Sequence, residues 1–251
     1  MIPKIIHFCW LSNEPYPKLI EKCISSWEKT LSDYQIKKWD TTNFDVNSVP
    51  FVKEAFEHRK WAFAADYIRL YALYTEGGVY LDSDVFVRKS FNDFLENSFF
   101  TSIEYNDKDY VESLSSKLIN KNGDLNIDSI IIPGLGLQAA VIGSVKEHPY
   151  IKDCLDYYTG KHFVLANGSY NNQIIAPDIL AHNAIKYGFK YKNSKQVLDN
   201  GMLILPSNFV AGHPKIQHHN NLAIHCCTGT WRNLSLLDRI VKFIRYKFYL
   251  K

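Results

Sequence analysis

The spacing of hydrophobic positions changes several times along the chain, and each change predicts a structural element. Residues 5–10 form a short apolar run rich in β-branched and aromatic side chains, which predicts a buried strand. After Pro17, apolar side chains recur at helical spacing from Leu19 to Leu31 and predict a helix. Residues 34–39 then alternate in character, which predicts a second strand.

The strongest pattern lies in the middle of the chain. Residues 60–76 place their apolar side chains along one wide helical stripe, which predicts a helix. Gly77 and Gly78 follow as a helix stop, because glycine tolerates the left-handed backbone that ends many helices. Residues 79–87 have the composition of a strand and carry two aspartates in the middle. We therefore expect a helix, a tight turn and a strand in direct succession.

The second half of the chain continues the alternation of strands and helices. Strands are predicted over residues 99–103 and 130–132, and helices over residues 149–158 and 172–187. Residues 106–128 are polar and poorly periodic, and they predict a loop or small insertion that could carry binding elements. The alternation predicts an α/β domain with a Rossmann-like, mainly parallel central sheet flanked by helices.

The composition is that of an ordinary folded protein. Of the 251 residues, 46% are hydrophobic and 22% are charged, and the net charge of +3 is too small to indicate nucleic-acid binding. The five cysteines are odd in number and lack a C-x-x-C pair, so we expect reduced thiols. The first residues lack the features of a signal peptide, and no run approaches the roughly 18 apolar residues of a membrane-spanning helix. These features indicate a cytoplasmic protein.

The end of the chain differs from residues 1–235, which we expect to form one domain. Residues 236–251 combine an apolar band, which includes Ile240 and Phe243, with five basic side chains and a single acid, Asp238. This pattern predicts a basic amphipathic helix that lies on an anionic membrane surface. The alternative is a terminal helix that packs on the domain and exposes its basic face to solvent.

The sharpest chemical feature is the sequence Asp82-Ser83-Asp84. Residues two apart on a strand point to one face, about 6.6 Å apart at about 3.3 Å per residue, so both carboxylates can address one cation. Two like charges within an apolar strand are costly unless something positive lies between them. A divalent cation with a diphosphate satisfies this requirement. The alternative interpretation is a turn with two solvated acids.

Two further features could contribute to the same site. Asp66 and Arg69 are three residues apart on the predicted central helix and share a face, which is equally consistent with an ordinary ion pair. His225 ends a predicted strand before a Thr-Gly-Thr-Trp turn. A lone histidine at a strand end is more often a hydrogen-bonded core residue. Beside a carboxylate pair, however, it becomes a candidate third contact to a metal or phosphate.

Three segments together resemble a known family. They are Ile-Pro-Lys-Ile-Ile-His-Phe-Cys-Trp at residues 2–10, Trp-Ala-Phe-Ala-Ala-Asp-Tyr-Ile-Arg-Leu-Tyr at 61–71 with Glu-Gly-Gly-Val-Tyr-Leu-Asp-Ser-Asp-Val at 76–85, and His225 with Thr230-Trp231. This combination resembles the family 32 glycosyltransferases, whose diagnostic block is a sugar-binding region containing D-x-D. That family is similar to the glucosylating domains of large clostridial toxins, and its small members are commonly enzymes of bacterial capsular or cell-surface polysaccharides.

The resemblance implies a GT-A fold, a nucleotide-sugar donor, and Mn²⁺ or Mg²⁺ bridging the D-x-D motif to the diphosphate. It implies that Asp82 and Asp84 are the catalytic carboxylates, with Asp84 ligating the metal directly, Asp82 through water, and His225 as a further ligand. It implies that Trp10 stacks on the nucleobase. The donor-binding residues that it implies are Phe8, Cys9, Trp10, Asp66, Arg69, Tyr80, Ser83 and Trp231.

The function implied is that of a retaining hexosyltransferase, with UDP and galactose favoured in the donor. We expect front-face attack by the acceptor hydroxyl, because the sequence offers no convincing carboxylate nucleophile. The implied acceptor is a saccharide, in particular a lipid-linked oligosaccharide met at the inner face of the plasma membrane. The alternative within this class is a GDP-mannose-dependent mannosyltransferase.

Two alternatives belong to other classes. A phosphatase of the haloacid-dehalogenase kind also begins with an aspartate pair at a strand end. Its motif, however, continues to Thr or Val two places after the second aspartate, where this chain has Phe86. The other alternative is a non-catalytic sugar-binding module in which the aspartates hold a structural ion.

Overall fold

Two hydrophobic cores, one on each face of a central sheet, organise the molecule. The structure is a computed structural model, and it describes residues 1–12, 14–115, 117–211 and 221–227. The strands are β1 (Ile5–Cys9), β2 (Gln35–Trp39), β3 (Gly78–Leu81), β4 (Val85–Val87), β5 (Phe99–Tyr105), β6 (Leu135–Leu137), β7 (Val141–Ser144), β8 (Gln196–Leu198), β9 (Met202–Leu205), β10 (Val210–Ala211) and β11 (Ala223–His225). The helices are α1 (Lys18–Thr30), α2 (Pro50–Glu57), α3 (Trp61–Glu76), α4 (Asp107–Ser115), α5 (Pro149–Asp156) and α6 (Ala176–Ala184), with short 3₁₀ turns at Val46–Ser48, Asn92–Phe94, Ile185–Tyr187 and Asp199–Gly201.

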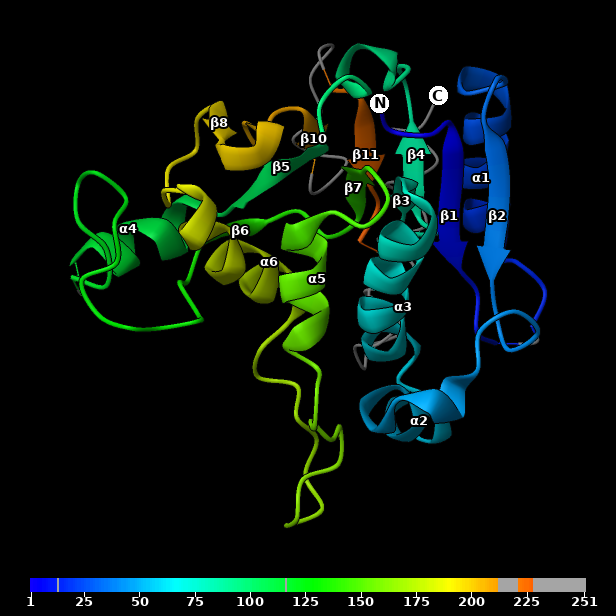
Figure 1. Cartoon of the computed structure of the whole chain (residues 1–251), viewed down its shortest axis with the longest axis horizontal. Helices are drawn as coiled ribbons and strands as arrows, with labels where there is room; N and C mark the ends of the chain where they lie inside the picture. The colour runs from blue at the N-terminus through cyan, green and yellow to red at the C-terminus, as the bar shows by residue number, and fades with distance from the viewer. Residues whose placement is uncertain (13, 116, 212–220, 228–251) are drawn as a thin grey trace.

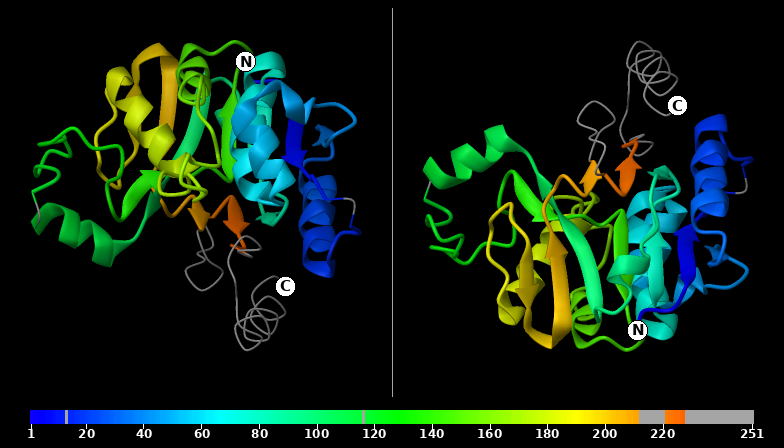
Figure 2. Two further views of the ribbon diagram at one scale, coloured as in Figure 1. Left: turned by 90° about the horizontal axis from the view of Figure 1, so that it is seen from below. Right: turned by 90° about the horizontal axis from the view of Figure 1, so that it is seen from above.

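The main sheet has the strand order β2-β1-β3-β7-β5-β9-β8, and β6 pairs with β5 beside it (Figure 1). Its pairings make five strands run in one direction, while β7 and β8 run against them. A second sheet of three strands has the order β10-β11-β4. Figure 2 shows α1 and α3 on opposite sides of β1. This architecture, with the aspartate pair directly after the central strand β3, confirms the α/β, GT-A type fold class expected from the sequence.

The two faces follow from the alternation of side chains along β1. Ile6 and Phe8 point into the core beneath α1, where the ring of Phe8 meets the ring of Trp27 edge-on at 5.4 Å. The opposite face carries the larger core, which packs α2, α3, α5 and α6 against the sheet. A strand whose side chains are buried on both faces can hold a site at its end in a fixed position.

The turn between α3 and β3 requires its two glycines. Gly77 and Gly78 have φ angles of 68° and 113°, in the left-handed region that disfavours other residues. A Cβ on Gly78 would lie 2.6 Å from the carbonyl oxygen of Ile5 on β1. His7, also on β1, lies with its Nε2 2.7 Å from the Gly77 carbonyl oxygen. The turn is therefore pressed against β1, and this contact sets where β3 and the following aspartates lie.

Most of the predicted elements are present. The helices expected over 60–76 and 149–158 are α3 and α5, and the early strand–helix–strand unit is β1, α1 and β2. The five cysteines, all within the described part of the chain, are free thiols, as expected. The proposed terminal helix at 236–251 lies outside the described residues.

One prediction about the site was wrong in its geometry. Residues 79–87 are not a single strand, because β3 ends at Leu81 and β4 begins at Val85. The backbone N–H of Val85 donates to the carbonyl oxygen of Asp82 at 2.9 Å, which closes a turn. The physical reason is that β4 leaves the main sheet and pairs with β11 in the second one. The two aspartates therefore lie on the turn between two sheets, rather than on one face of a strand.

Three further predictions differ from the structure. The polar segment 106–128 contains the helix α4, whose first turn carries Asp107 and Asp109, where acidic side chains favour a helix start. No strand forms over residues 130–132, because the following residue, Pro133, lacks the N–H that a β-ladder needs. The strand in this region is β6, which begins two residues after Pro133. The helix expected over 172–187 begins later, at Ala176, where Asp178 accepts a hydrogen bond from the backbone N–H of Ile175 at 3.1 Å.

A buried histidine holds the start of α5 in place. The Nδ1 atom of His148 accepts a hydrogen bond from the backbone N–H of Tyr150 at 3.1 Å, and its Nε2 atom lies 3.1 Å from the hydroxyl of Ser98. Only 2% of His148 is exposed. Burial lowers the pKa of His148 to about 4, because the charged imidazolium would lose its hydration.

We expect this histidine to make the fold sensitive to acid. The unfolded chain binds a proton at His148 near pH 6.5, whereas the folded protein does so only near pH 4, so the free energy of unfolding falls as the pH drops through this window. The expected loss is about 2 kcal/mol between about pH 7 and pH 5. His148→Asn keeps a capping acceptor and should remove this part of the pH dependence. Urea unfolding of both proteins at both pH values tests this; an equal loss in the two proteins would contradict it.

Candidate active site

Three side chains from different elements converge at the end of β3. Asp82 and Asp84 come from the β3–β4 turn, and His225 comes from the end of β11. The Nε2 atom of His225 lies 3.3 Å from Oδ1 of Asp84 and 3.8 Å from Oδ2 of Asp82. One ligand atom from each of the three residues lies within 4.8 Å of the others. The antiparallel pairing of β11 with β4 produces this convergence, because it places His225 opposite Val85.

The cluster has the chemistry of a site for a divalent cation. Two carboxylates and an imidazole nitrogen are ligands that Mn²⁺ and similar ions accept. Their spacing leaves room for a cation at ordinary ligand distances of about 2.0–2.2 Å from each atom. The side chains of Asp82 and His225 are 25% and 21% exposed, so the cluster is open to a ligand on one side. These residues therefore fit the metal that the D-x-D motif implies.

The protonation of His225 responds to the same carboxylates. Burial opposes the charged form of its imidazole, but the charge of Asp84 and the contacts to Cys227 outweigh burial and raise the pKa of His225 well above 6.5. Without a cation, the imidazolium thus compensates the two carboxylates. The cluster is arranged for a positive charge at its centre.

Arg69 joins this cluster to the helix α3. Its side chain is only 5% exposed, and its Nη2 donates to Oδ1 of Asp66 at 2.7 Å. Its Nη1 donates to the carbonyl oxygen of Ala139 at 2.7 Å and lies 3.5 Å from Oδ1 of Asp82. The guanidinium also lies over the ring of Tyr80, 4.9 Å from its centroid. The predicted pair on one face of the helix is thus a buried ion pair that reaches the D-x-D turn.

Asp66 is an unusual carboxylate because little of it meets water. Its side chain is 12% exposed. Burial raises its pKa to about 7, although the charge of Arg69 acts in the opposite direction. A carboxyl group in this state can both accept and donate a hydrogen bond near neutral pH, which suits the binding of hydroxyl groups.

The other predicted residues fall into two groups. Tyr80 and Phe8 are buried, with 1% and 4% of their surfaces exposed. Tyr80 reaches the site through its hydroxyl, which donates to Oδ1 of Asp82 at 3.0 Å. Phe8 can offer only its backbone to a ligand, because its ring is in the core. Cys9, Ser83 and Trp10 are partly exposed at the same end of β1 and β3. Trp231 lies outside the described residues.

Trp10 is held at the end of β1 by its surroundings. Its indole N–H donates to the carbonyl oxygen of Glu14 at 2.9 Å, and its ring meets that of Tyr16 edge-on at 4.8 Å. Its backbone N–H donates to the carbonyl oxygen of Trp39 at 3.0 Å. An aromatic ring fixed in this way, at the carboxyl end of a parallel strand, is a suitable platform for stacking.

The sequence analysis missed a segment that supports the site. Gln138–Ala140 supplies the carbonyl of Ala139 to Arg69 and the carbonyl of Ala140 to the backbone N–H of Asp82, at 2.9 Å. The side chain of Gln138 is buried and its Oε1 accepts from the backbone N–H of Ala140 at 3.1 Å. The signal that could have found it is one amide side chain in the otherwise apolar run from Leu135 to Ile142.

Comparisons with known proteins place this site in context. Residues 17–101 match the family described as the glycosyltransferase sugar-binding region containing DXD motif, and this segment includes Asp66, Arg69, Asp82 and Asp84. An uncharacterized glycosyltransferase, L373, of Acanthamoeba polyphaga mimivirus is 35% identical over 106 residues, which cover 40% of this chain and 42% of that protein. The chain therefore spans less than half the length of that curated relative.

Solved structures of glycosyltransferases are also similar. The PaToxG glycosyltransferase has a TM-score of 0.47 and 18% identity, covering 74% of this chain and 69% of its own. The galactosyltransferase LgtC, solved with donor and acceptor sugar analogs, has a TM-score of 0.46 and 17% identity, covering 98% of this chain and 96% of its own. The family match is the comparison that bears on the site, because the matched segment contains the D-x-D turn and the Asp66–Arg69 pair. Residues 17–101 are similar to the glycosyltransferase sugar-binding region containing DXD motif.

We expect Asp84→Asn to abolish tight binding of Mn²⁺. The amide keeps the size of the side chain but removes the charge that the cation requires. Because Asp84 lies in a turn, the fold should persist. Asp93→Asn, at an exposed position away from the cluster, is the matched control. Titration calorimetry with MnCl₂ measures the affinity of both variants for the ion. Wild-type affinity in the Asp84 variant would show that Asp84 is not a metal ligand.

Proposed function

We propose that this protein is a metal-dependent, retaining glycosyltransferase that moves a hexose from a nucleotide sugar to a saccharide acceptor. The observation that carries the proposal is the convergence of Asp82, Asp84 and His225 beside the buried pair of Asp66 and Arg69. A cation site and a set of hydroxyl-binding groups are what a nucleotide-sugar donor needs at its diphosphate and at its sugar. The family match over residues 17–101 supports the same class.

Each part of the site has a distinct task in this proposal. Asp84, His225 and, through water, Asp82 would hold Mn²⁺ or Mg²⁺, and the cation would supply stabilisation of the negative charge that develops on the leaving diphosphate. Asp66 binds donor hydroxyls, and Arg69 fixes both Asp66 and Asp82. Trp10 stacks on the nucleobase, flanked by the backbone of Phe8 and Cys9.

The remaining donor-binding residues line the path between base and sugar. Ser83, at the centre of the turn, and the hydroxyl of Tyr80 border the sugar, and the family resemblance assigns Trp231 to the diphosphate. Among the described residues of the site, the carboxylates of Asp82 and Asp84 are assigned to the metal and that of Asp66 to the donor. None is left to act as a nucleophile. Retention therefore proceeds by attack of the acceptor hydroxyl on the same face as the leaving group.

The donor and acceptor are proposed from the family 32 resemblance. UDP-galactose is the preferred donor, and GDP-mannose is the alternative. The acceptor is a lipid-linked oligosaccharide of capsular or cell-surface polysaccharide synthesis, used at the inner face of the plasma membrane. Within the described residues no helix combines the length and apolarity needed to cross a bilayer.

The reaction products distinguish this proposal from the other classes. With Mn²⁺ and a panel of UDP- and GDP-sugars, a glycosyltransferase releases the nucleoside diphosphate, and its weak hydrolysis of donor is detectable without an acceptor. A phosphatase of the haloacid-dehalogenase kind releases inorganic phosphate, and a sugar-binding module releases neither. Product analysis that finds no nucleoside diphosphate from any donor, with or without a saccharide mixture, would reject the proposal.

We expect Trp10→Ala to weaken binding of the nucleoside diphosphate by roughly 1–3 kcal/mol, because stacking of a base on an aromatic ring contributes about this amount. Tyr105→Ala is the control, since Tyr105 is also partly exposed and also packs against another ring, that of Tyr110. Titration calorimetry with UDP and with GDP in the presence of Mn²⁺ gives both affinities. Equal weakening by both substitutions would argue against a role for Trp10 at the base.

A further inference from the structure

A hairpin between α5 and α6 extends away from the body of the protein. Figure 1 shows this connection, drawn in green to yellow, projecting past α2. Val164 and Tyr170 pair as an antiparallel bridge, and the tip closes with a hydrogen bond from the N–H of Gly168 to the carbonyl oxygen of Leu165 at 2.8 Å. We call residues 159–172 the α5–α6 hairpin. It has a defined backbone, whereas the sequence analysis predicted no element over residues 159–171.

The base of the hairpin is anchored to α2 and α3. Phe163 is fully buried, and its ring lies 5.4 Å from that of Phe51 and 5.1 Å from that of Phe63. The carboxylate of Glu54 on α2 accepts from the backbone N–H of Val164 at 2.9 Å and pairs with His162 at 2.5 Å. These contacts hold the hairpin in one direction and leave its tip outside the core.

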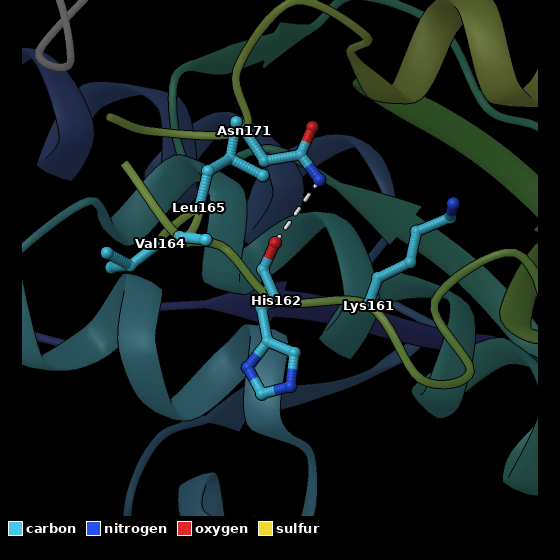
Figure 3. Close-up of a pocket in the computed structure, with 6 residues that line it drawn as sticks. Lys161, His162, Val164, Leu165 and Asn171 are labelled. Atoms are coloured by element: carbon cyan, nitrogen blue, oxygen red, sulfur yellow. Dashed lines mark hydrogen bonds between the residues drawn. The ribbon is translucent and has the colours of Figure 1, made fainter. Parts of the chain in front are cut away.

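The tip exposes apolar side chains. Leu165 is 42% exposed, Ala166 is exposed and Val164 is partly exposed. Figure 3 shows Val164 and Leu165 side by side at a hollow that Lys161 and Asn171 also border. This hollow has a volume of about 510 Å³. The tip therefore presents adjacent aliphatic side chains to solvent, outside the core of the protein.

Basic side chains outnumber acidic ones around the tip, where Glu54 pairs with His162 and Glu57 ends α2. No Asp or Glu occurs between Asp156 and Asp178, whereas Lys161 and His162 flank the apolar tip. The turn between α2 and α3 adds His58, Arg59 and Lys60. This turn lies against the hairpin, because Lys60 lies over the ring of Tyr170 at 5.3 Å and His58 Nδ1 lies 3.2 Å from the hydroxyl of Tyr170. An apolar tip within a basic collar matches the charge and polarity of an anionic bilayer surface.

The hairpin lies at the same end of the molecule as the candidate active site. Phe63, which contacts its base, precedes Asp66 by three residues on α3, or about 4.5 Å along the helix axis. Asp66 in turn contacts Arg69, which reaches the D-x-D turn. The base of the hairpin is therefore linked through α3 to the candidate site.

We propose that the α5–α6 hairpin docks on anionic lipid bilayers, with Val164, Leu165 and Ala166 entering the interface and the basic collar binding lipid headgroups. The purpose of this docking is to present the active site to acceptors carried by the membrane, and this purpose rests on the proposed function. The docking itself depends only on the hairpin and its charges. It is independent of the terminal segment 236–251.

Co-sedimentation of the full chain with vesicles tests this proposal. Wild-type protein should pellet with vesicles of phosphatidylserine and phosphatidylcholine at low salt, and much less with phosphatidylcholine alone. Leu165→Glu should lower partitioning by about tenfold, and Arg59→Gln by about fivefold. The matched controls are Val197→Glu and Lys195→Gln, at exposed positions on and beside the edge strand β8, and both should pellet like wild type.

The outcomes separate docking from catalysis. Wild-type partitioning of Leu165→Glu, equal losses in Val197→Glu, or equal binding to neutral vesicles would each overturn the docking proposal. Circular dichroism and Mn²⁺-dependent nucleotide binding should be unchanged in Leu165→Glu, because its side chain makes no contact with the metal or donor residues. Failure of wild-type protein to release nucleoside diphosphate would reject the proposed function and leave the vesicle result intact.

Discussion

The buried guanidinium of Arg69 is the contact on which the site depends. It contacts three parts of the chain. On the helix α3 it binds Asp66, before β7 it binds the carbonyl oxygen of Ala139, and on the D-x-D turn it lies beside Asp82. A buried charge of this kind is tolerated only when its hydrogen bonds are satisfied, and here carboxylates and a carbonyl satisfy it in three directions. The planar fork of arginine suits this task, because lysine could not address these partners with the same geometry.

This arrangement explains why the site tolerates several carboxylates in little space. Asp66, Asp82 and Asp84 would repel one another if they were alone. Arg69 lies between the first two, and His225 lies beside the last two. The protein therefore places a fixed positive charge, Arg69, between Asp66 and Asp82, and a titratable imidazole, His225, beside Asp82 and Asp84. The preorganisation is electrostatic, and the Ala139 carbonyl and the Tyr80 hydroxyl help to fix Arg69 and Asp82 in place.

The sequence predicted those features whose cause is local. The stripe along α3, the glycine pair and the ion pair three residues apart each depend on neighbouring positions, and all three are present. The split of residues 79–87 could not be predicted, because it depends on β11, which is far away in the chain. The support from Gln138–Ala140 and the anchoring of the hairpin by Glu54 depend on tertiary contacts in the same way. In each case the contact that decides the structure joins residues that are far apart in the sequence.

The origin of His225 in β11 has a consequence for biosynthesis. Both aspartates emerge from the ribosome long before the imidazole that completes their cluster, and β4 also waits for β11 to form its sheet. A nascent chain thus carries an incomplete binding set until β11 has been made. Under the proposed function, cation affinity would be coupled to closure of the segment between β4 and β11, whose entropic cost a bound ion would help to offset. Ion binding would then report that the second sheet has formed, since the three side chains come together only in a molecule in which β11 pairs with β4.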